Sequence, residues 1–393
     1  MPRYVSISPA PLSLSYPGIP TLLGAPRSYE PMAPQSMAET PLAIPEDAAT
    51  FSNNFIGAAT LSKHQYAAFL AALSLTTPTY SFSEDDVVIT RDMLRQLYTF
   101  ASGRIYSKYT GFDLSIEVVG NTVFVSRGSM DALERVHGIH PDHTRGYSFN
   151  FINRTTNLLQ GFEKHVFGTG WQRAIRYSLG DLKLVVLCDI DACRATDPAL
   201  AEFSTHGRSA EEKSHNSPHS ASPDLPSALS SLNIADTTTA QEPTSRLGIT
   251  VYRAGPANPQ PSHCVDIRTA QTRYQLYNYV SKLYFGRQSH VIVGLHGARG
   301  RQDRGAFFDV ADVRAGNVIR RWERSENTQT ALRKLVALLQ RFRAIAEEKG
   351  RCSVKSKVVN GRLVAQVRVM AKQKEGEETL AEMVEKTVGS GRT

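Results

Sequence analysis

Two pairs of charged residues in this sequence could take part in catalysis. Asp189 and Asp191 directly follow an apolar run at residues 184–187, and Asp266 and Arg268 lie within a second apolar segment. Side chains at positions i and i+2 of a strand point to the same face, so the members of each pair project together. If the two strands are neighbours, three carboxylates and one cation meet at one place.

Three carboxylates with water molecules suit a hard divalent cation such as Mg²⁺ or Mn²⁺. Such an ion can activate water and stabilise the charge that develops on a phosphoryl group during its transfer. Charged residues at this spacing are also common by chance, and the alternative is a strand end at which polar residues simply leave the sheet. Because burying an unpaired charge is costly, charges beside apolar strands favour a site with a ligand or a partner.

The strands that would carry these residues belong to a regular pattern of strands and helices. Three strand pairs with tight turns are predicted, and the turn at Asn360-Gly361 has the strongest signal. Predicted strands occupy residues 87–90, 114–119, 122–126, 171–177, 182–190, 248–253, 264–268, 290–295, 306–310, 352–359 and 363–369. Predicted helices occupy residues 65–73, 92–101, 271–285 and 328–349. The pattern predicts an α/β fold with a central mixed sheet flanked by helices.

The composition divides the chain of 393 residues into segments. Residues 1–50 are rich in Pro, Ser and Ala, and residues 197–245 in Ser, His, Thr, Pro and Asp. Because such segments cannot bury enough apolar surface to offset chain entropy, both are predicted to be disordered. Residues 51–196 and 246–370 are then the two parts of one domain, and residues 371–393 form a charged C-terminal tail.

Charge and cysteine content constrain the partners and the compartment. The net charge of +8 permits a polyanion partner, and Lys and Arg cluster in runs at residues 299–304, 314–324 and 333–343, although solvated helix faces explain such runs equally well. No stretch approaches the ~18 uninterrupted apolar residues of a membrane span, so no membrane partner is expected. The four cysteines lack zinc-type spacing and are too few for a disulfide scaffold. We therefore expect a reduced intracellular compartment, nuclear or cytoplasmic, while the oligomeric state is not indicated.

The order of several short motifs resembles that of the DXO family of decapping nucleases, which share the PD-(D/E)XK nuclease core. The similar segments are residues 120–124, 146–150, 172–177, 189–193, 265–269, 279–281 and 291–295. Their order along the chain is more specific than any single motif. The resemblance implies a nuclease-type core for the central sheet.

The layout is also similar to that of a set of fungal proteins, many of which carry the name geranylgeranyl pyrophosphate synthetase. A prenyl synthase needs two Asp-Asp-x-x-Asp motifs on helices to bind diphosphate through Mg²⁺. The only adjacent Asp pair in this sequence, Asp85-Asp86, is followed by the β-branched residues 87–89. The sequence therefore offers no basis for that activity.

The resemblance implies a metal ion held by Asp189, Asp191, Asp266 and Asn150. Asn150 stands where the family has a metal-binding Glu, Asp189 and Asp266 replace Glu, and Arg268 replaces the catalytic Lys. A guanidinium can clamp a phosphate but cannot carry a proton. We therefore expect Asp191, Asp266 and Arg268 to be catalytic, with Arg268 steadying the phosphate and with Mg²⁺ or Mn²⁺ as the cofactor.

Three further residues are expected to contact the substrate. Arg95 could match the family's early substrate-binding Arg, Arg176 lies on a strand that could line an RNA channel, and Ser281 replaces the family's Gln. A solvent-exposed helical Arg is the alternative for Arg95. Arg173 and Arg176 are three residues apart and face opposite sides of their strand, so at most one of them lines such a channel. Glu163 could supply the carboxylate that the site lacks.

The expected function is metal-dependent hydrolysis of phosphate bonds at the 5′ end of RNA, of the decapping, pyrophosphohydrolase or 5′ exonuclease type. Because several positions of the family's site are altered, a second hypothesis is a degenerate relative that binds RNA 5′ ends or a partner protein without cutting. A third is an interaction protein in which the acidic pairs only bond to neighbouring Arg side chains. Some members of the family have an exonuclease as a protein partner, and the resemblance makes such a partner a candidate here.

Overall fold

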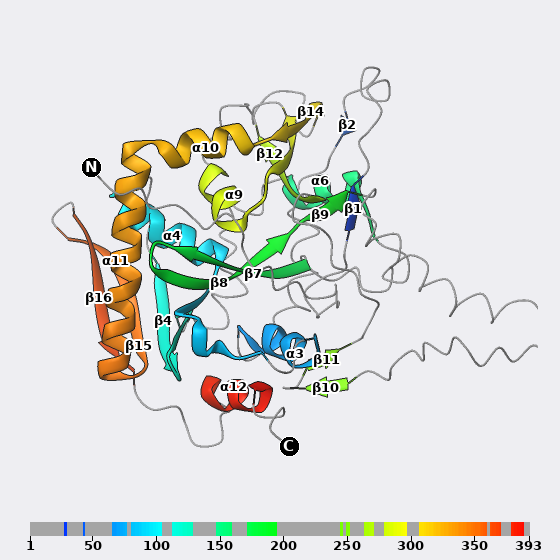
Figure 1. Ribbon diagram of the computed structural model, residues 1–393. Coiled ribbons are helices and arrows are strands. Elements are labelled where there is room, and N and C mark those ends of the chain that lie inside the picture. The colour runs from blue at the N-terminus through cyan, green and yellow to red at the C-terminus, as the bar shows by residue number, and fades with distance from the viewer. Residues whose placement is uncertain are drawn as a thin grey trace, which may run out of the picture.

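The computed structural model in Figure 1 has an α/β architecture, with mixed sheets surrounded by helices. It describes residues 27–29, 42–43, 65–76, 80–103, 112–128, 147–158, 171–194, 244–246, 249–251, 263–270, 279–296, 306–359, 362–370 and 379–388. The predicted α/β class with a mixed sheet flanked by helices is confirmed. Most strands belong to one of two large sheets. The chain passes directly from a strand of the first sheet to a strand of the second at Asp191.

The first sheet contains the strands of the predicted hairpins. Its strands are β3 (Val87–Thr90), β4 (Asp113–Val119), β5 (Thr122–Arg127), β7 (Trp171–Leu179), β8 (Leu182–Ile190), β15 (Cys352–Val359) and β16 (Arg362–Val369). Within the described residues their order is β16-β15-β4-β5-β3-β8-β7, with β3 parallel to β5 and β8 and the other neighbours antiparallel. Gly120 and Gly180 turn two of the hairpins at a φ of 60°, where a residue without Cβ meets no strain. The third turn, at residues 360–361, lies outside the described residues.

The second sheet brings together segments that are far apart in the sequence. Its strands are β1 (Arg27–Tyr29), β2 (Leu42–Ala43), β6 (Thr156–Leu158), β9 (Ala192–Arg194), β12 (Cys264–Ala270), β13 (His290–His296) and β14 (Ala306–Arg314). The order is β2-β14-β13-β12-β9-β1-β6 across the described part of the chain. Strand β12 is parallel to β13 and antiparallel to β9. Strands β10 (Thr244–Arg246) and β11 (Ile249–Val251) pair separately.

Helices cover both faces of the first sheet, as Figure 1 shows. The helices of the described residues are α3 (Ala67–Thr76), α4 (Arg91–Ala101), α6 (Ser148–Thr155), α9 (Val280–Gly286), α10 (Gly316–Arg324), α11 (Glu326–Lys349) and α12 (Leu380–Val388), with a short 3-10 helix η1 (Phe82–Glu84), and α6 packs on the second sheet instead. Helix α9 confirms the end of the helix predicted at residues 271–285, of which residues 271–278 are outside the described residues. Strand β3 is buried on both faces, because Val87 and Ile89 pack into one core and Val88 into the other.

Helices α4 and α11 pack on one face of this sheet. Helix α11 begins where the Ser325 hydroxyl accepts a hydrogen bond from the backbone N–H of Thr328, at 3.3 Å. Leu335 and Phe342 belong to an apolar stripe of this helix that faces the sheet, and both are buried. These side chains fill the space between the helix and the sheet, so the core rather than helix propensity holds α11 in place.

Helices α3 and α12 cover the other face, and this corrects the prediction for the C-terminus. Residues 371–393 are predicted to be a charged tail, but Leu380, Met383 and Val384 of α12 are buried in the same core as Leu70 and Leu73 of α3. Apolar residues at positions i, i+3 and i+4 form a stripe on one side of a helix. Because this stripe finds a partner in α3, these residues belong to the folded domain.

The N-terminal prediction also differs at two short strands. Within residues 1–50, β1 pairs with β6 and β9, and β2 pairs with β14, so these residues are ordered by strand pairing rather than disordered. Most of the predicted insertion at 197–245 and the basic run at 299–304 lie outside the described residues. No helix in the described part of the chain is long and apolar enough to cross a membrane.

Candidate functional site

The two predicted charge pairs meet at the junction of the two sheets. Asp191 lies between the end of β8 and the start of β9. Strand β9 pairs antiparallel with β12 in a register that places Cys193 opposite Cys264. Two residues further along this register, Asp191 comes beside Asp266, as predicted for neighbouring strands.

Asp266 is almost fully buried and is neutralised by two cations. Nη2 of Arg268 lies 2.6 Å from Oδ1 of Asp266, and Nζ of Lys282, from α9, lies 3.1 Å from Oδ2. Burial alone would raise the pKa of Asp266, but Arg268 and a hydrogen bond from Asp191 hold this pKa below its ordinary value. Asp266 therefore stays ionised between the two cations.

Asp191 is the second carboxyl group of the site. Its Oδ2 accepts a hydrogen bond from the backbone N–H of Ile267 at 2.8 Å and lies 3.7 Å from Nη1 of Arg268. Burial raises the pKa of Asp191 well above its ordinary value; Arg268 opposes this shift, and the adjacent Asp266 adds to it. The two pKa shifts have opposite directions because two carboxyl groups this close titrate as a pair.

Helix α4 adds two more cations. Arg91 is 2% exposed, and its Nη1 donates a hydrogen bond of 2.5 Å to Oε1 of Gln288. Burial opposes the charge of Arg91, but nearby Asp266 raises the pKa of Arg91 above its ordinary value. Arg95 lies one turn further along α4, and its charge helps to lower the pKa of Asp266. A Cβ atom at Gly286 would lie only 2.8 Å from Cδ of Arg91, so glycine at this position leaves room for the arginine.

Four cations therefore lie around Asp191 and Asp266, and the charge of Asp92 acts on Arg91 and Arg268 as well. We call this group the Asp266 site, defined by Arg91, Arg95, Asp191, Asp266, Arg268 and Lys282. The side chains of Arg268 and Asp191 are 17% and 15% exposed, which marks the side of the site that solvent reaches. A partly exposed guanidinium among several cations is suited to an anion, and a guanidinium matches the geometry of phosphate oxygens.

The other predicted site residues lie at different positions. Asp189 is exposed near the end of β8, where its charge helps to raise the pKa of Arg91. Asn150 is partly buried on α6, which packs against the face of β12 opposite to Asp266. Ser281 is partly buried in the first turn of α9. The structure thus brings Asp191, Asp266, Arg268 and Arg95 together, with Asp189 close by.

The described residues contain no group of three His, Cys, Asp or Glu side chains that could hold a metal ion. Glu163, the candidate replacement carboxylate, lies outside them. The two acidic side chains that do converge, Asp191 and Asp266, are joined by cations instead of a third carboxylate.

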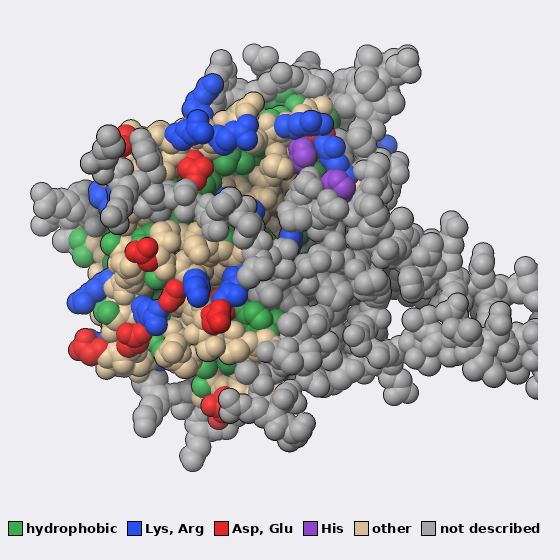
Figure 2. Space-filling view, in the orientation of Figure 1, with side chains coloured by type: hydrophobic (Ala, Val, Ile, Leu, Met, Phe, Trp, Pro, Cys, Tyr) green, Lys and Arg blue, Asp and Glu red, His purple; other side chains and the backbone are tan. Residues whose placement is uncertain are grey.

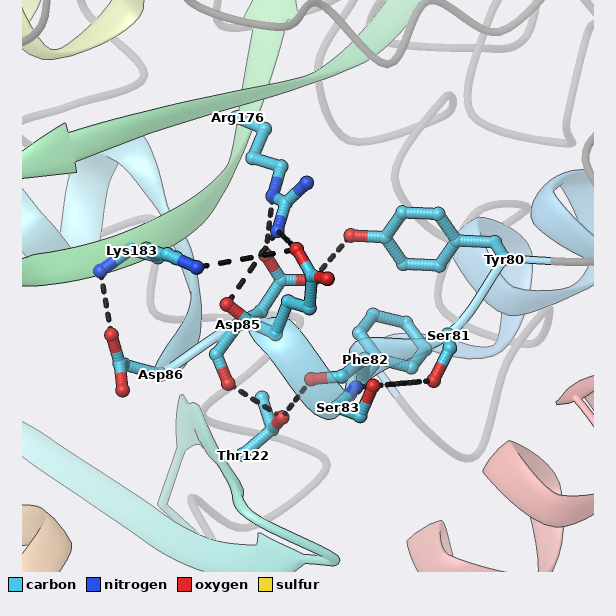
Figure 3. Close-up of polar contacts among 10 residues, drawn as sticks. Tyr80, Ser81, Phe82, Ser83, Asp85, Asp86, Thr122, Arg176 and Lys183 are labelled. Carbon is cyan, nitrogen blue, oxygen red and sulfur yellow. Dashed lines mark hydrogen bonds and ion pairs between the residues drawn. The ribbon is translucent and has the colours of Figure 1, made fainter.

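Arg176 takes part in a different network, at the opposite end of β3. Its Nε lies 2.6 Å from Oδ1 of Asp85, and its Nη2 lies 3.3 Å from Oε2 of Glu84. The Tyr80 hydroxyl donates to the other oxygen of Asp85. Figure 3 shows these side chains converging on Asp85, between β7 and the loop that leads into β3. Arg176 is therefore paired with protein carboxylates and does not lie at the Asp266 site.

Lys282 and Arg91 were not predicted from the sequence, although each carries a signal. Lys282 lies in the apolar segment of residues 280–285, where a buried cation needs a charged partner. Arg91 is the first residue of α4, and a cation is unfavourable at the positive end of a helix unless an anion lies nearby. Asp266 is that anion for both residues.

A model of a known protein family matches most of this chain. The family described as "Domain of unknown function (DUF8563)" matches residues 28–360. The chain belongs to this family. No curated protein matches its sequence.

Solved structures with the same fold are those of Rai1, a protein of the DXO family. The crystal structure of Schizosaccharomyces pombe Rai1 has a TM-score of 0.53 and 10% identity, covering 94% of this chain and 97% of that one. The structure of Scheffersomyces stipitis Rai1 in complex with (3′-NADP)⁺ and a calcium ion has a TM-score of 0.55 and 11% identity, covering 99% of this chain and 100% of that one. The S. pombe protein in complex with 3′-FADP has a TM-score of 0.52, 11% identity and coverage of 94% and 97%. The predicted resemblance of this DUF8563 member to the DXO family is confirmed at the level of the fold.

Proposed function

We propose that this chain binds the phosphorylated 5′ end of RNA at the Asp266 site. The observation that carries the proposal is the convergence of four cations on Asp191 and Asp266. These cations suit a terminal phosphate, and the partly exposed Arg268 is the group placed to contact it. Lys282 and Arg91 are more deeply buried and would act through their charge.

The shared fold supports this assignment. Two of the Rai1 structures that this chain resembles were solved with (3′-NADP)⁺ or 3′-FADP, both of which are nucleotides with phosphate groups. At 10–11% identity, the likeness supports a nucleotide-binding role only together with the charges of the Asp266 site. Those charges come from this chain's own residues.

A basic surface beside the site suits the RNA backbone. Arg320, Arg321 and Arg324 are exposed on α10. Figure 2 shows Lys and Arg side chains gathered along the top of the molecule, where α10 lies in Figure 1. Helix α10 packs through Trp322 against Tyr284 of α9, the helix that carries Lys282, with ring centroids 4.9 Å apart. Binding through such a surface should weaken steeply as salt increases.

The test compares oligoribonucleotides that differ only in a 5′-hydroxyl, 5′-monophosphate or 5′-triphosphate, with affinity measured by fluorescence anisotropy. We expect the phosphorylated ends to bind more tightly, and Arg268→Met to remove this preference. The control variant is Lys183→Met, because Lys183 is 52% exposed in the network around Asp85 and far from the Asp266 site. Equal affinity of the wild-type protein for phosphorylated and hydroxyl ends would contradict the proposal.

Metal-dependent hydrolysis at the 5′ end of RNA is the second candidate. Its support is the proximity of two acidic side chains, Asp191 and Asp266, and the calcium ion in the Scheffersomyces stipitis Rai1 structure. The test incubates RNA with a 5′-triphosphate, an unmethylated cap or an NAD cap with Mg²⁺ or Mn²⁺. Product that requires the metal and disappears in Asp191→Ala would establish hydrolysis. Binding without product would leave recognition of the 5′ end as the function.

A further inference from the structure

The carboxylate at the centre of the Asp266 site has a protein cation beside each of its oxygens, although Oδ2 accepts no hydrogen bond within the described residues. Oδ1 is 2.6 Å from a guanidinium nitrogen of Arg268, and Oδ2 is 3.1 Å from the ammonium of Lys282. The side chain of Asp266 is 1% exposed and that of Lys282 is 8% exposed. An incoming ion would therefore have to displace a buried cation rather than water.

The neighbouring carboxyl group is also engaged. Oδ2 of Asp191 accepts the backbone N–H of Ile267 at 2.8 Å and faces Nη1 of Arg268 at 3.7 Å. The same guanidinium thus lies against both acidic side chains. A Mg²⁺ ion takes six ligands at about 2.0–2.1 Å, so it would have to enter the space that this guanidinium fills.

The surrounding charge disfavours a divalent cation further. Arg91 is buried near Asp266, and Arg95 is close enough for its charge to act on the same carboxylate. A doubly positive ion would add to the positive side chains already gathered around Asp191 and Asp266, and repulsion between like charges is strong in a buried site. The described residues do not fit a Mg²⁺ or Mn²⁺ ion.

We propose that the ammonium of Lys282 and the guanidinium of Arg268 take the place of a divalent cation, so that the site binds a 5′-phosphate without metal. This inference rests on the proposed recognition of RNA 5′ ends and adds how the terminal phosphate is neutralised. It assigns Lys282 as a binding residue and Asp266 as the anchor that positions both cations. The ligand class is a terminal phosphate presented without a bound metal ion.

The first test measures binding of 5′-phosphorylated and 5′-hydroxyl oligoribonucleotides in EDTA and in millimolar Mg²⁺ or Mn²⁺. We expect the preference for the phosphorylated end to be the same in all three conditions. Preference that appears only with Mg²⁺ or Mn²⁺ would overturn the inference while leaving 5′-end recognition intact. Absence of any preference in every condition would instead overturn the proposed function.

The second test needs no RNA. Electron paramagnetic resonance of Mn²⁺ titrated into the wild-type protein should show no stoichiometric tight binding. A stoichiometric Mn²⁺ site that disappears in Asp266→Asn would contradict the inference. The absence of such a site supports it, whatever the RNA affinity.

Variants of Lys282 separate charge from packing. Lys282→Met should weaken binding of the 5′-phosphorylated oligonucleotide in EDTA by about tenfold, which corresponds to about 1.4 kcal/mol. Lys282→Arg keeps the positive charge and should retain most of the affinity, and Lys183→Met should behave as wild type. Thermal melts establish that each variant is folded. Wild-type affinity for the phosphorylated end in folded Lys282→Met would refute the role of Lys282.

Discussion

Replacement of Arg176 should destabilise the protein without changing its affinity for RNA. Arg176→Met removes the ion pair to Asp85, whose side chain is fully buried, and breaking a buried pair costs about 3–5 kcal/mol. Two features keep the loss near the lower limit. The Tyr80 hydroxyl still donates to Asp85, and burial already raises the pKa of Asp85 despite Arg176, so this carboxyl can take up a proton in the variant. We expect a loss of about 3 kcal/mol in the free energy of unfolding.

Urea denaturation followed by circular dichroism measures this loss. Arg333→Met is the matched control, because it removes an arginine ion pair with Glu326 at 2.9 Å on the exposed side of α11. Surface pairs of this kind contribute about 0–1 kcal/mol, so the control should unfold close to the wild type. Anisotropy with the 5′-phosphorylated oligonucleotide completes the assay. A stable Arg176→Met variant with weakened RNA binding would show that Arg176 contacts the substrate and that the network in Figure 3 is not its main role.

Three further changes test other parts of the structure. Gly286→Ala places a methyl group 2.8 Å from Cδ of Arg91 and should lower the free energy of unfolding by about 1–3 kcal/mol. Urea denaturation measures this loss, and an unchanged midpoint would contradict the close contact. Burial raises the pKa of Glu117 in the folded protein, despite the nearby Arg351. The protonated side chain of Glu117 therefore favours folding at a pH below its pKa in the unfolded chain, and this stabilisation is lost as the pH rises through its pKa in the folded protein. Glu117→Gln should therefore raise the Tm relative to wild type at about pH 8, with the difference closing towards about pH 4; a constant difference would refute this cause. Phe342→Ala should cost about 3–5 kcal/mol in guanidinium chloride denaturation, because the ring is buried between α11 and the sheet, whereas a loss below 1 kcal/mol would show that the core closes around the cavity.

The protein's local structure could be predicted well where the signal is contained in a short segment. The β4–β5 hairpin follows from alternating β-branched residues on either side of Gly120, and α11 follows from an apolar stripe of about four turns. Helices α6 and α10 were not predicted. Helix α10 begins at Gly316 and is highly charged, so its helical character depends on packing of Trp322 against α9.

The candidate site also combines residues that a local sequence pattern identifies with residues that it does not. Asp191, Asp266 and Arg268 could be identified because charges beside apolar strands stand out in the sequence, and their convergence required only that two strands be neighbours. The partners Lys282 and Arg91 come from separate helices, and no local pattern indicates which buried carboxylate they would meet. Arg176 could not be separated from the site by sequence either, because alternation along a strand gives the face of a side chain but not which end of the sheet the chemistry occupies.

The sequence by itself determined most strands of the first sheet, the long helix α11, the hairpins and the acidic residues of the site, because these depend on periodicity, turn chemistry and the cost of isolated charges. Only the tertiary structure decided the passage from the first sheet to the second at Asp191, the pairing of β9 with β12 and the convergence of cations on Asp266. Those features join segments that are distant along the chain. Their contacts depend on how whole elements pack, and local sequence patterns do not specify that packing.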